Sequence, residues 1–156
     1  MKFVSFYLDF ETPGAWLAFQ RWPGMLQGLS HAARYLPLAR SDLGLGSADA
    51  HESTTEADPS WRRPAPWPFN PEPLLDLAWC CARCEAPNRF VLESILRHVW
   101  TTGEDALAPA RLAALRDDLR RFGDPDPETA RNLRRRAVAQ VGDIGLPELP
   151  AFEFRG

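Results

Sequence analysis

The sequence predicts an α/β domain with a small central sheet, on the strength of three observations. Residues 3–10, FVSFYLDF, are nearly apolar throughout, which is typical of a strand buried on both faces of a sheet. Helical patterns then follow one another between residues 71 and 142. Near its end the chain alternates like a short strand at residues 151–154, AFEF. A β-α-β opening, an inserted helical block and a returning helix and strand account for this order.

A helical pattern replaces the first strand within a few residues. Residues 13–29 predict the first helix, with Trp16, Leu17 and Phe19 turned inward. Pro23 falls inside this span and is expected to kink or split the helix, because proline has no amide N–H to donate.

A second strand and a long loop come next. Residues 31–40 predict a short strand, and Pro37 places it toward the edge of the sheet or marks the end of the strand. Residues 41–69 are rich in glycine, serine, aspartate and proline and show no sustained periodicity. We therefore interpret them as a loop.

The block that follows reads as four helical segments, at residues 71–85, 88–103, 109–123 and 126–142. The last segment has the clearest boundaries. Asp126 is expected to cap it, Pro127 stands at its first helical position, and Gly142 is expected to lie beyond its last turn.

Composition and charge are those of an ordinary globular domain. The 156 residues are 45% hydrophobic and 25% charged, which is enough for one domain with a sizeable core. The net charge of −3 and the isoelectric point near 5.6 offer no basic surface for nucleic acid. We therefore expect no nucleic-acid partner.

The compartment is predicted from three further features. Asp9 and Glu11 interrupt the opening apolar stretch, so it does not predict a secretory signal. No run is long and apolar enough to predict a membrane span. Cys80, Cys81 and Cys84 lie within five residues, unlike a secreted disulfide framework. We expect a cytoplasmic protein that does not bind membranes.

Four stretches in order resemble the 2-hydroxychromene-2-carboxylate isomerases and kappa-class glutathione transferases. FYLDFETPGAWLAF looks like that family's first strand-to-helix segment, and ARYLPL looks like its second strand. PWPFNPEPLLDLAWCCA, followed by FVLESILRHVWTTGEDALAPARLAAL, looks like its helical insertion. VGDIGLP looks like the segment whose proline is cis in thioredoxin folds.

The resemblance implies a single DsbA-like thioredoxin domain over residues 1–156. Its thioredoxin part would be residues 1–40 and 126–156, joined by the loop 41–69 and a helical insertion at 70–123. This sequence departs from the family pattern in two places. The family's segment corresponding to residues 41–66 is longer, and its members continue through a last strand and helix that have no counterpart here.

The implied activity is that of a glutathione-dependent isomerase of the 2-hydroxychromene-2-carboxylate type, or a related transferase, acting on a small aromatic carboxylate in aromatic degradation. Thr12, where the family usually has serine, would stabilise the glutathione thiolate at a helix N-terminus. The alternative is that Thr12 only caps that helix. Leu146 and a cis Pro147 would hold the glutathione backbone, with Pro150 as a rival for the cis position.

The proline-rich segment 64–71 crosses from the loop to the helical block, and we call it the crossing segment. Three of its residues fall where the family lines its acceptor pocket: Trp67, Phe69 and Asn70. They form a candidate aromatic wall of the substrate pocket. Packing of the crossing over the core is the alternative interpretation.

Two other function classes remain open. The first is a non-catalytic, shortened thioredoxin-fold module that binds a protein partner or forms a homodimer through an open sheet edge. The second is a thiol-disulfide oxidoreductase using Cys81 and Cys84, although their expected place, on one face in mid-helix, favours packing. No histidine lies at a zinc-motif spacing from these cysteines, so no metal is expected.

Overall fold

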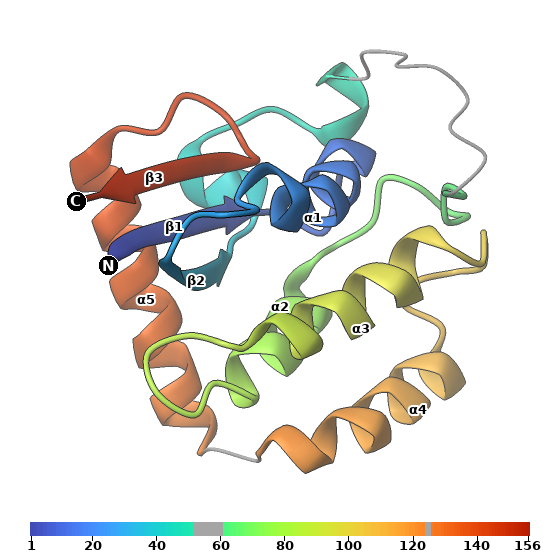
Figure 1. Cartoon of the computed structure of the whole chain (residues 1–156). Coiled ribbons are helices and arrows are strands. Elements are labelled where there is room, and N and C mark those ends of the chain that lie inside the picture. The colour runs from blue at the N-terminus through green and yellow to red at the C-terminus, as the bar shows by residue number, and fades with distance from the viewer. Residues whose placement is uncertain (52–60, 124–125) are drawn as a thin grey trace.

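A computed structural model gives the fold of residues 1–51, 61–123 and 126–156, limited to the backbone at residues 50 and 51. Its sheet has three strands in the order β2-β1-β3. The strands are β1 (Lys2–Leu8), β2 (His31–Pro37) and β3 (Ala151–Arg155). β1 runs parallel to β2 and antiparallel to β3 (Figure 1). The three predicted strands are confirmed, and the central place of β1 explains why its sequence is apolar on both faces.

Five α-helices complete the described structure: α1 (Pro13–Met25), α2 (Glu72–Cys80), α3 (Arg89–Trp100), α4 (Pro109–Leu119) and α5 (Pro127–Ile144). The described residues also form short 3-10 turns at Arg40–Leu43, Ala48–His51 and Arg120–Phe122. The α/β fold class predicted from the sequence is confirmed. Residues 52–60 of the predicted loop lie outside the described residues.

Helices cover both faces of the sheet (Figure 1). Neighbouring residues of a strand point to opposite faces, so Phe6 and Tyr7 enter different cores. Phe6 stacks on Phe152 with ring centroids 4.4 Å apart and packs on the side of α1. Tyr7 packs on the side of α5, where Gln140 donates a hydrogen bond to its hydroxyl.

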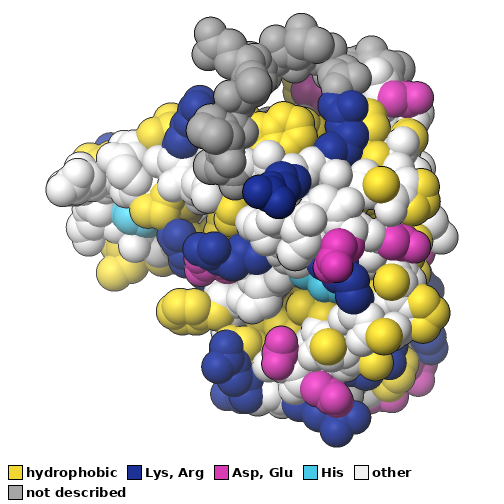
Figure 2. Space-filling model, turned by 90° about the vertical axis from the view of Figure 1, so that its right-hand side faces the viewer, with side chains coloured by type: hydrophobic (Ala, Val, Ile, Leu, Met, Phe, Trp, Pro, Cys, Tyr) yellow, Lys and Arg dark blue, Asp and Glu magenta, His cyan; other side chains and the backbone are white. Residues whose placement is uncertain are grey.

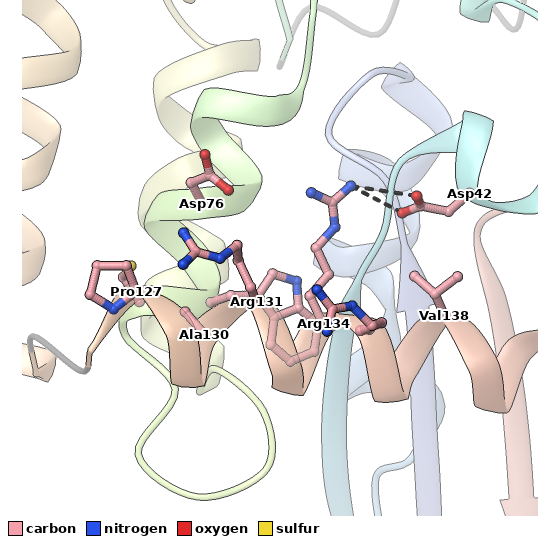
Figure 3. A pocket seen from close by; sticks show the side chains of 10 residues that line it. Asp42, Asp76, Pro127, Ala130, Arg131, Arg134 and Val138 are labelled. Carbon is pink, nitrogen blue, oxygen red and sulfur yellow. Dashed lines mark hydrogen bonds and ion pairs between the residues drawn. The ribbon is translucent and has the colours of Figure 1, made fainter.

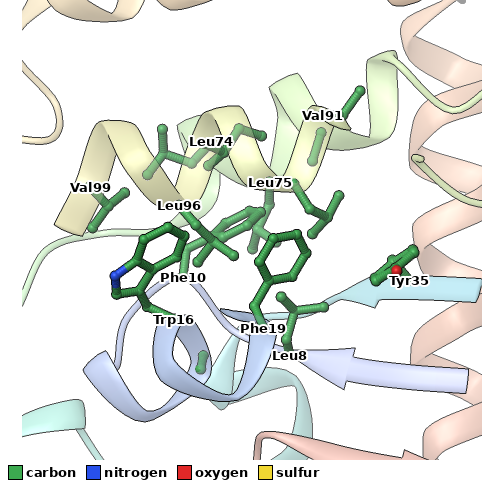
Figure 4. Close-up of a cluster of buried hydrophobic side chains, with 14 of the residues drawn as sticks. Leu8, Phe10, Trp16, Phe19, Tyr35, Leu74, Leu75, Val91, Leu96 and Val99 are labelled. Atoms are coloured by element: carbon green, nitrogen blue, oxygen red, sulfur yellow. The ribbon is translucent and has the colours of Figure 1, made fainter. Parts of the chain in front are cut away.

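The larger core joins the β1–α1 unit to the helical block (Figure 4). Its buried side chains include Leu8, Phe10, Trp16, Phe19, Leu74, Leu75, Leu96 and Val99. Trp100 of α3 donates its indole N–H to the Phe10 carbonyl over 3.2 Å, which ties the helical block to the end of the central strand. The described helices contain none that is long and apolar enough to cross a membrane.

The first helix ends earlier than predicted. α1 stops at Met25, two residues after Pro23, because the missing proline amide and the following glycine weaken its last turn. Trp16 and Phe19 are buried as expected, whereas Leu17 is only half-buried.

The last helix ends later than predicted. Gly142 lies inside α5, and Gly145, with a φ of 69°, takes the left-handed conformation that ends the helix. The expected cap is confirmed, since the Asp126 carboxylate accepts the Thr129 amide over 3.3 Å.

The face turned toward the viewer in Figure 2 shows basic, acidic and hydrophobic side chains intermingled. Phe90, on α3, has 61% of its surface exposed, and its ring stacks on Phe122 with centroids 6.5 Å apart. This helix therefore combines a buried face with an exposed aromatic ring.

Burial on α3 predicts which truncation destabilises the fold. Leu96→Ala removes a fully buried side chain and is expected to lower the free energy of unfolding by about 2–5 kcal/mol. Phe90→Ala removes more atoms but from an exposed position, so its expected loss is below about 1 kcal/mol. Urea unfolding followed by circular dichroism measures both. Equal losses would contradict the packing described.

Candidate functional site

A buried carboxylate organises the turn from β1 into α1. Asp9 has no exposed surface, and its Oδ1 accepts the backbone amides of Glu11 over 2.8 Å and Thr12 over 2.7 Å. The Thr12 hydroxyl donates to both carboxylate oxygens, at 3.0 and 3.1 Å. Asp9 thereby fixes the residues that lead into the first turn of α1.

Burial raises the pKa of Asp9 from 3.8 to about 6. The hydrogen bonds from Thr12 and the Glu11 amide, and the charge of Arg40, act in the opposite direction. They keep the rise smaller than burial alone would produce. Asp9 therefore changes its charge close to neutral pH.

A buried arginine joins this turn to the segment before β3. Arg40 is 2% exposed, and its Nη1 lies 2.9 Å from Oε1 of Glu148. Its Nε donates to the Gly46 carbonyl over 3.0 Å, and its backbone amide donates to Oε2 of Glu11 over 2.9 Å. Within the described parts of the chain, Nη2 has no hydrogen-bond partner.

Glu11 is a second carboxyl group with a raised pKa. Burial moves its pKa from 4.5 to about 7, and the negative charges of Asp9 and Asp42 act in the same direction. The hydrogen bond from the Arg40 amide opposes the rise. The end of β1 thus holds two acids that titrate within the physiological range.

The Thr12 side chain is turned inward, toward Asp9. Its hydroxyl does not cap α1, so the capping interpretation is wrong, and its proton points to Asp9 rather than toward a ligand. A carboxylate is a stronger acceptor than a neutral group, which accounts for the inward orientation. Thr12 is only 9% exposed.

The expected cis bond before Pro147 is wrong. Among the described residues the cis peptide bonds precede Pro66, Pro68 and Pro150, so the rival position is the one observed. α5 extends to Ile144, which leaves Leu146 packed in the turn after the helix and Pro147 exposed. Pro150 directly precedes Ala151, which pairs with Tyr7, and it therefore lies beside the end of β1.

The crossing segment contributes one of its three expected residues to this site. Trp67 donates its indole N–H to the Glu11 carbonyl over 2.9 Å, and the Arg63 guanidinium lies 4.4 Å from its ring centroid. Phe69 is buried in the larger core instead. Asn70 is exposed, and its Oδ1 accepts the Glu72 amide at the start of α2 over 3.1 Å.

The two spaced cysteines do not share a helical face as expected. α2 ends at Cys80, so Cys81 and Cys84 lie in the following turn, where Cys81 is buried and Cys84 is exposed. The hydrogen bond from Cys81 to the Leu119 carbonyl, 3.7 Å long, fits a packing role. In the described ranges no three or more histidine, cysteine or acidic residues gather as a metal site would require.

Sequence reasoning missed the charged residues of this site. Asp9 and Glu11 were visible as acids in an otherwise apolar stretch, and Asp9 stands two residues before Glu11, as an Asx turn requires. Arg40 and Glu148 gave no such signal, because only the folded chain brings them together over 108 positions.

Comparison with known proteins establishes the fold. The chain is similar to a solved structure of 2-hydroxychromene-2-carboxylate isomerase, with a TM-score of 0.64 and 15% identity. The match covers 98% of this chain and 87% of that one. The fold is therefore thioredoxin-like, with a three-stranded sheet and added helices. No protein-family model matches the sequence, and neither does any curated protein.

The raised pKa values predict how stability depends on pH. Both acids hold protons more tightly in the folded state than in the unfolded state, so the free energy of unfolding falls as pH rises through 6 and 7. Glu11→Gln removes one of these titrations and is expected to reduce the decline between about pH 5 and 8 by about 1–3 kcal/mol, allowing for the partial exposure of Glu11.

The matched control is Glu85→Gln, whose side chain is 78% exposed and which should leave the pH profile unchanged. Urea titrations at several pH values provide the measurement. A wild-type profile that does not decline above pH 5, or equal profiles for wild type and Glu11→Gln, would contradict the assignment.

Proposed function

We propose that this chain is a glutathione-dependent isomerase of the 2-hydroxychromene-2-carboxylate type, or a related glutathione transferase, that acts on a small aromatic carboxylate. The observation that supports this most is the likeness in fold, over 98% of the chain, to a 2-hydroxychromene-2-carboxylate isomerase. Three features at the end of β1 add local support.

The first feature is an accessible helix N-terminus. The 13-residue α1 begins at Pro13, and Gly14 is exposed, with no atom within 4 Å of the position its Cβ would take. First-turn amides have no partner inside a helix, and they carry the positive end of the helix dipole. An anion such as a thiolate is favoured above Gly14.

The second feature is the Thr12–Asp9 pair. Glutathione, when bound, supplies a thiolate nucleophile. Because the Thr12 hydroxyl proton is held by Asp9, Oγ1 of Thr12 keeps its lone pairs to accept a proton from the ligand side. With its pKa raised to about 6, Asp9 is a suitable final acceptor near neutral pH. Thr12 acts here as an acceptor, rather than as the donor that the sequence suggested.

The third feature is Trp67, whose indole is anchored on the Glu11 carbonyl and whose ring lies under Arg63. This aromatic side chain can form one wall of a pocket for a planar substrate. The backbone of glutathione would need a free amide beside the cis proline. The Leu149 amide beside Pro150 already donates to Oε1 of Glu148 over 3.0 Å, so this part of glutathione fits less well. The residues present therefore fit the thiol end of glutathione.

Calorimetric titration with reduced glutathione tests the proposal. Wild type is expected to bind with a millimolar or smaller dissociation constant, and Thr12→Val is expected to bind roughly tenfold more weakly, because one hydrogen bond is lost. Thr101→Val, at the end of α3, is the matched control and should bind like wild type. Absence of binding to wild type, or equal affinity in both variants, sinks the proposal.

A second candidate function has its own supporting observation. β3 pairs with β1 alone among the described strands, so its other edge has free backbone groups, and Phe154 on it is 61% exposed. Such an edge suits a non-catalytic module that forms a homodimer or binds a partner strand.

Sedimentation velocity separates this candidate from the enzyme. Phe154→Asp is expected to dissociate a dimer that forms through β3, because it places a charge on the contact strand. Phe90→Asp, at an equally exposed phenylalanine on α3, is expected to leave the dimer intact. A wild-type chain that stays monomeric at about 100 μM, a concentration at which stable dimers form, excludes self-association by this edge.

A further inference from the structure

A cavity of about 550 Å³ lies between α2, α5 and the 3-10 turn Arg40–Leu43, and none of its lining residues belongs to the turn from β1 into α1. This volume falls in the range that holds a small ligand. Its apolar lining consists of Trp79, Cys80, Pro127, Ala130 and Val138. Its charged lining consists of Asp42, Asp76, Arg131, Arg134 and Arg135, most of which Figure 3 labels.

One of the three arginines, Arg134, already forms ion pairs with two acidic side chains. Arg134 reaches from α5 to Asp42, with Nη2 3.2 Å from Oδ2 (Figure 3). It also pairs with Glu72 at the start of α2, with Nη1 2.5 Å from Oε2. These contacts hold the 3-10 turn and α2 against α5. They satisfy the Arg134 charge, so Arg134 shapes the cavity rather than attracting a ligand.

The other two arginines are not neutralised. Arg131 and Arg135 stand four residues apart on α5, and neither forms an ion pair with any described residue. Nη1 of Arg135 donates a hydrogen bond to Oδ1 of Asn132, on the same helix, over 3.1 Å. Like charges at this spacing destabilise a helix slightly, and an anion bound between them removes that repulsion.

The opposite wall carries one negative charge. Asp76 of α2 faces Arg131 across the cavity without an ion pair within 4.0 Å (Figure 3). Setting aside the paired Arg134 and Asp42, the lining has two free positive charges and one negative charge.

We propose that this cavity binds a small amphipathic carboxylate, with its carboxylate between Arg131 and Arg135 and its apolar part against Trp79, Ala130 and Val138. Arginine binds carboxylates through two parallel hydrogen bonds, which a neutral ligand cannot reproduce. This site is separate from the end of β1 and does not depend on the function proposed for that end.

NMR titration of the full chain with 4-phenylbutyrate tests the site, and amide shifts are expected to change mainly in α2 and α5. Arg131→Gln and Arg135→Gln are each expected to weaken binding roughly tenfold. Arg136→Gln is the control, because it removes the same charge from the same helix at a residue that lines a different cavity. Asp76→Asn is expected to tighten binding several-fold, since it removes the one unpaired negative charge of the lining.

The uncharged probe 4-phenylbutyramide separates carboxylate recognition from simple burial of a phenyl ring, and it is expected to bind at least roughly tenfold more weakly. The inference is overturned if the two probes bind equally or if Arg136→Gln weakens binding as much as the other two substitutions. Shift changes confined to Gly14 and Trp67, or no changes at all, overturn it as well. Glutathione is not expected to displace the probe, so this result stands apart from the function proposed above.

Discussion

The passage from the central strand into the first helix depends on a single buried carboxylate. Asp9 has no contact with solvent, and two backbone amides and one hydroxyl donate to it, which offsets the cost of burying its charge. These bonds set the direction in which the chain leaves β1. They also place the open N-terminus of α1 beside the segment that enters β3.

The same turn gathers charge around it. The Arg40 backbone amide donates to the Glu11 carboxylate, and the Arg40 side chain pairs with Glu148 before β3. Asp42 lies two residues after Arg40 in the same 3-10 turn, and its carboxylate pairs with Arg134 of α5 on the opposite side of that turn. The short 3-10 turn Arg40–Leu43 is therefore a common wall of the candidate site and of the cavity beside α5. A change in charge on one side of this wall acts on the other, as the contribution of Asp42 to the raised pKa of Glu11 illustrates.

Hydrophobic periodicity and the prolines and glycines at element boundaries were enough to predict the strands, the helices and the α/β class, because these signals are local in the sequence. The features that the sequence did not predict depend on tertiary structure. Thr12 followed by Pro13 looks the same whether the hydroxyl caps the helix or turns back to Asp9, and burial of the carboxylate decided between them. The end of α5 was placed at Gly142, but the left-handed glycine is Gly145. That shift alone moved the segment before β3 and made Pro150, rather than Pro147, the proline beside the site.

Direct titration of the Asp9 carboxyl carbon by NMR, in wild type and in Thr12→Val, tests the central claim most sharply. We predict a pKa of about 6 in wild type, because burial opposes the charged form. We predict a higher pKa in Thr12→Val, because the hydroxyl that stabilises the carboxylate is gone. A wild-type pKa near 3.8 that the substitution leaves unchanged would mean that this carboxylate is solvated, and that the turn is not held in the way described.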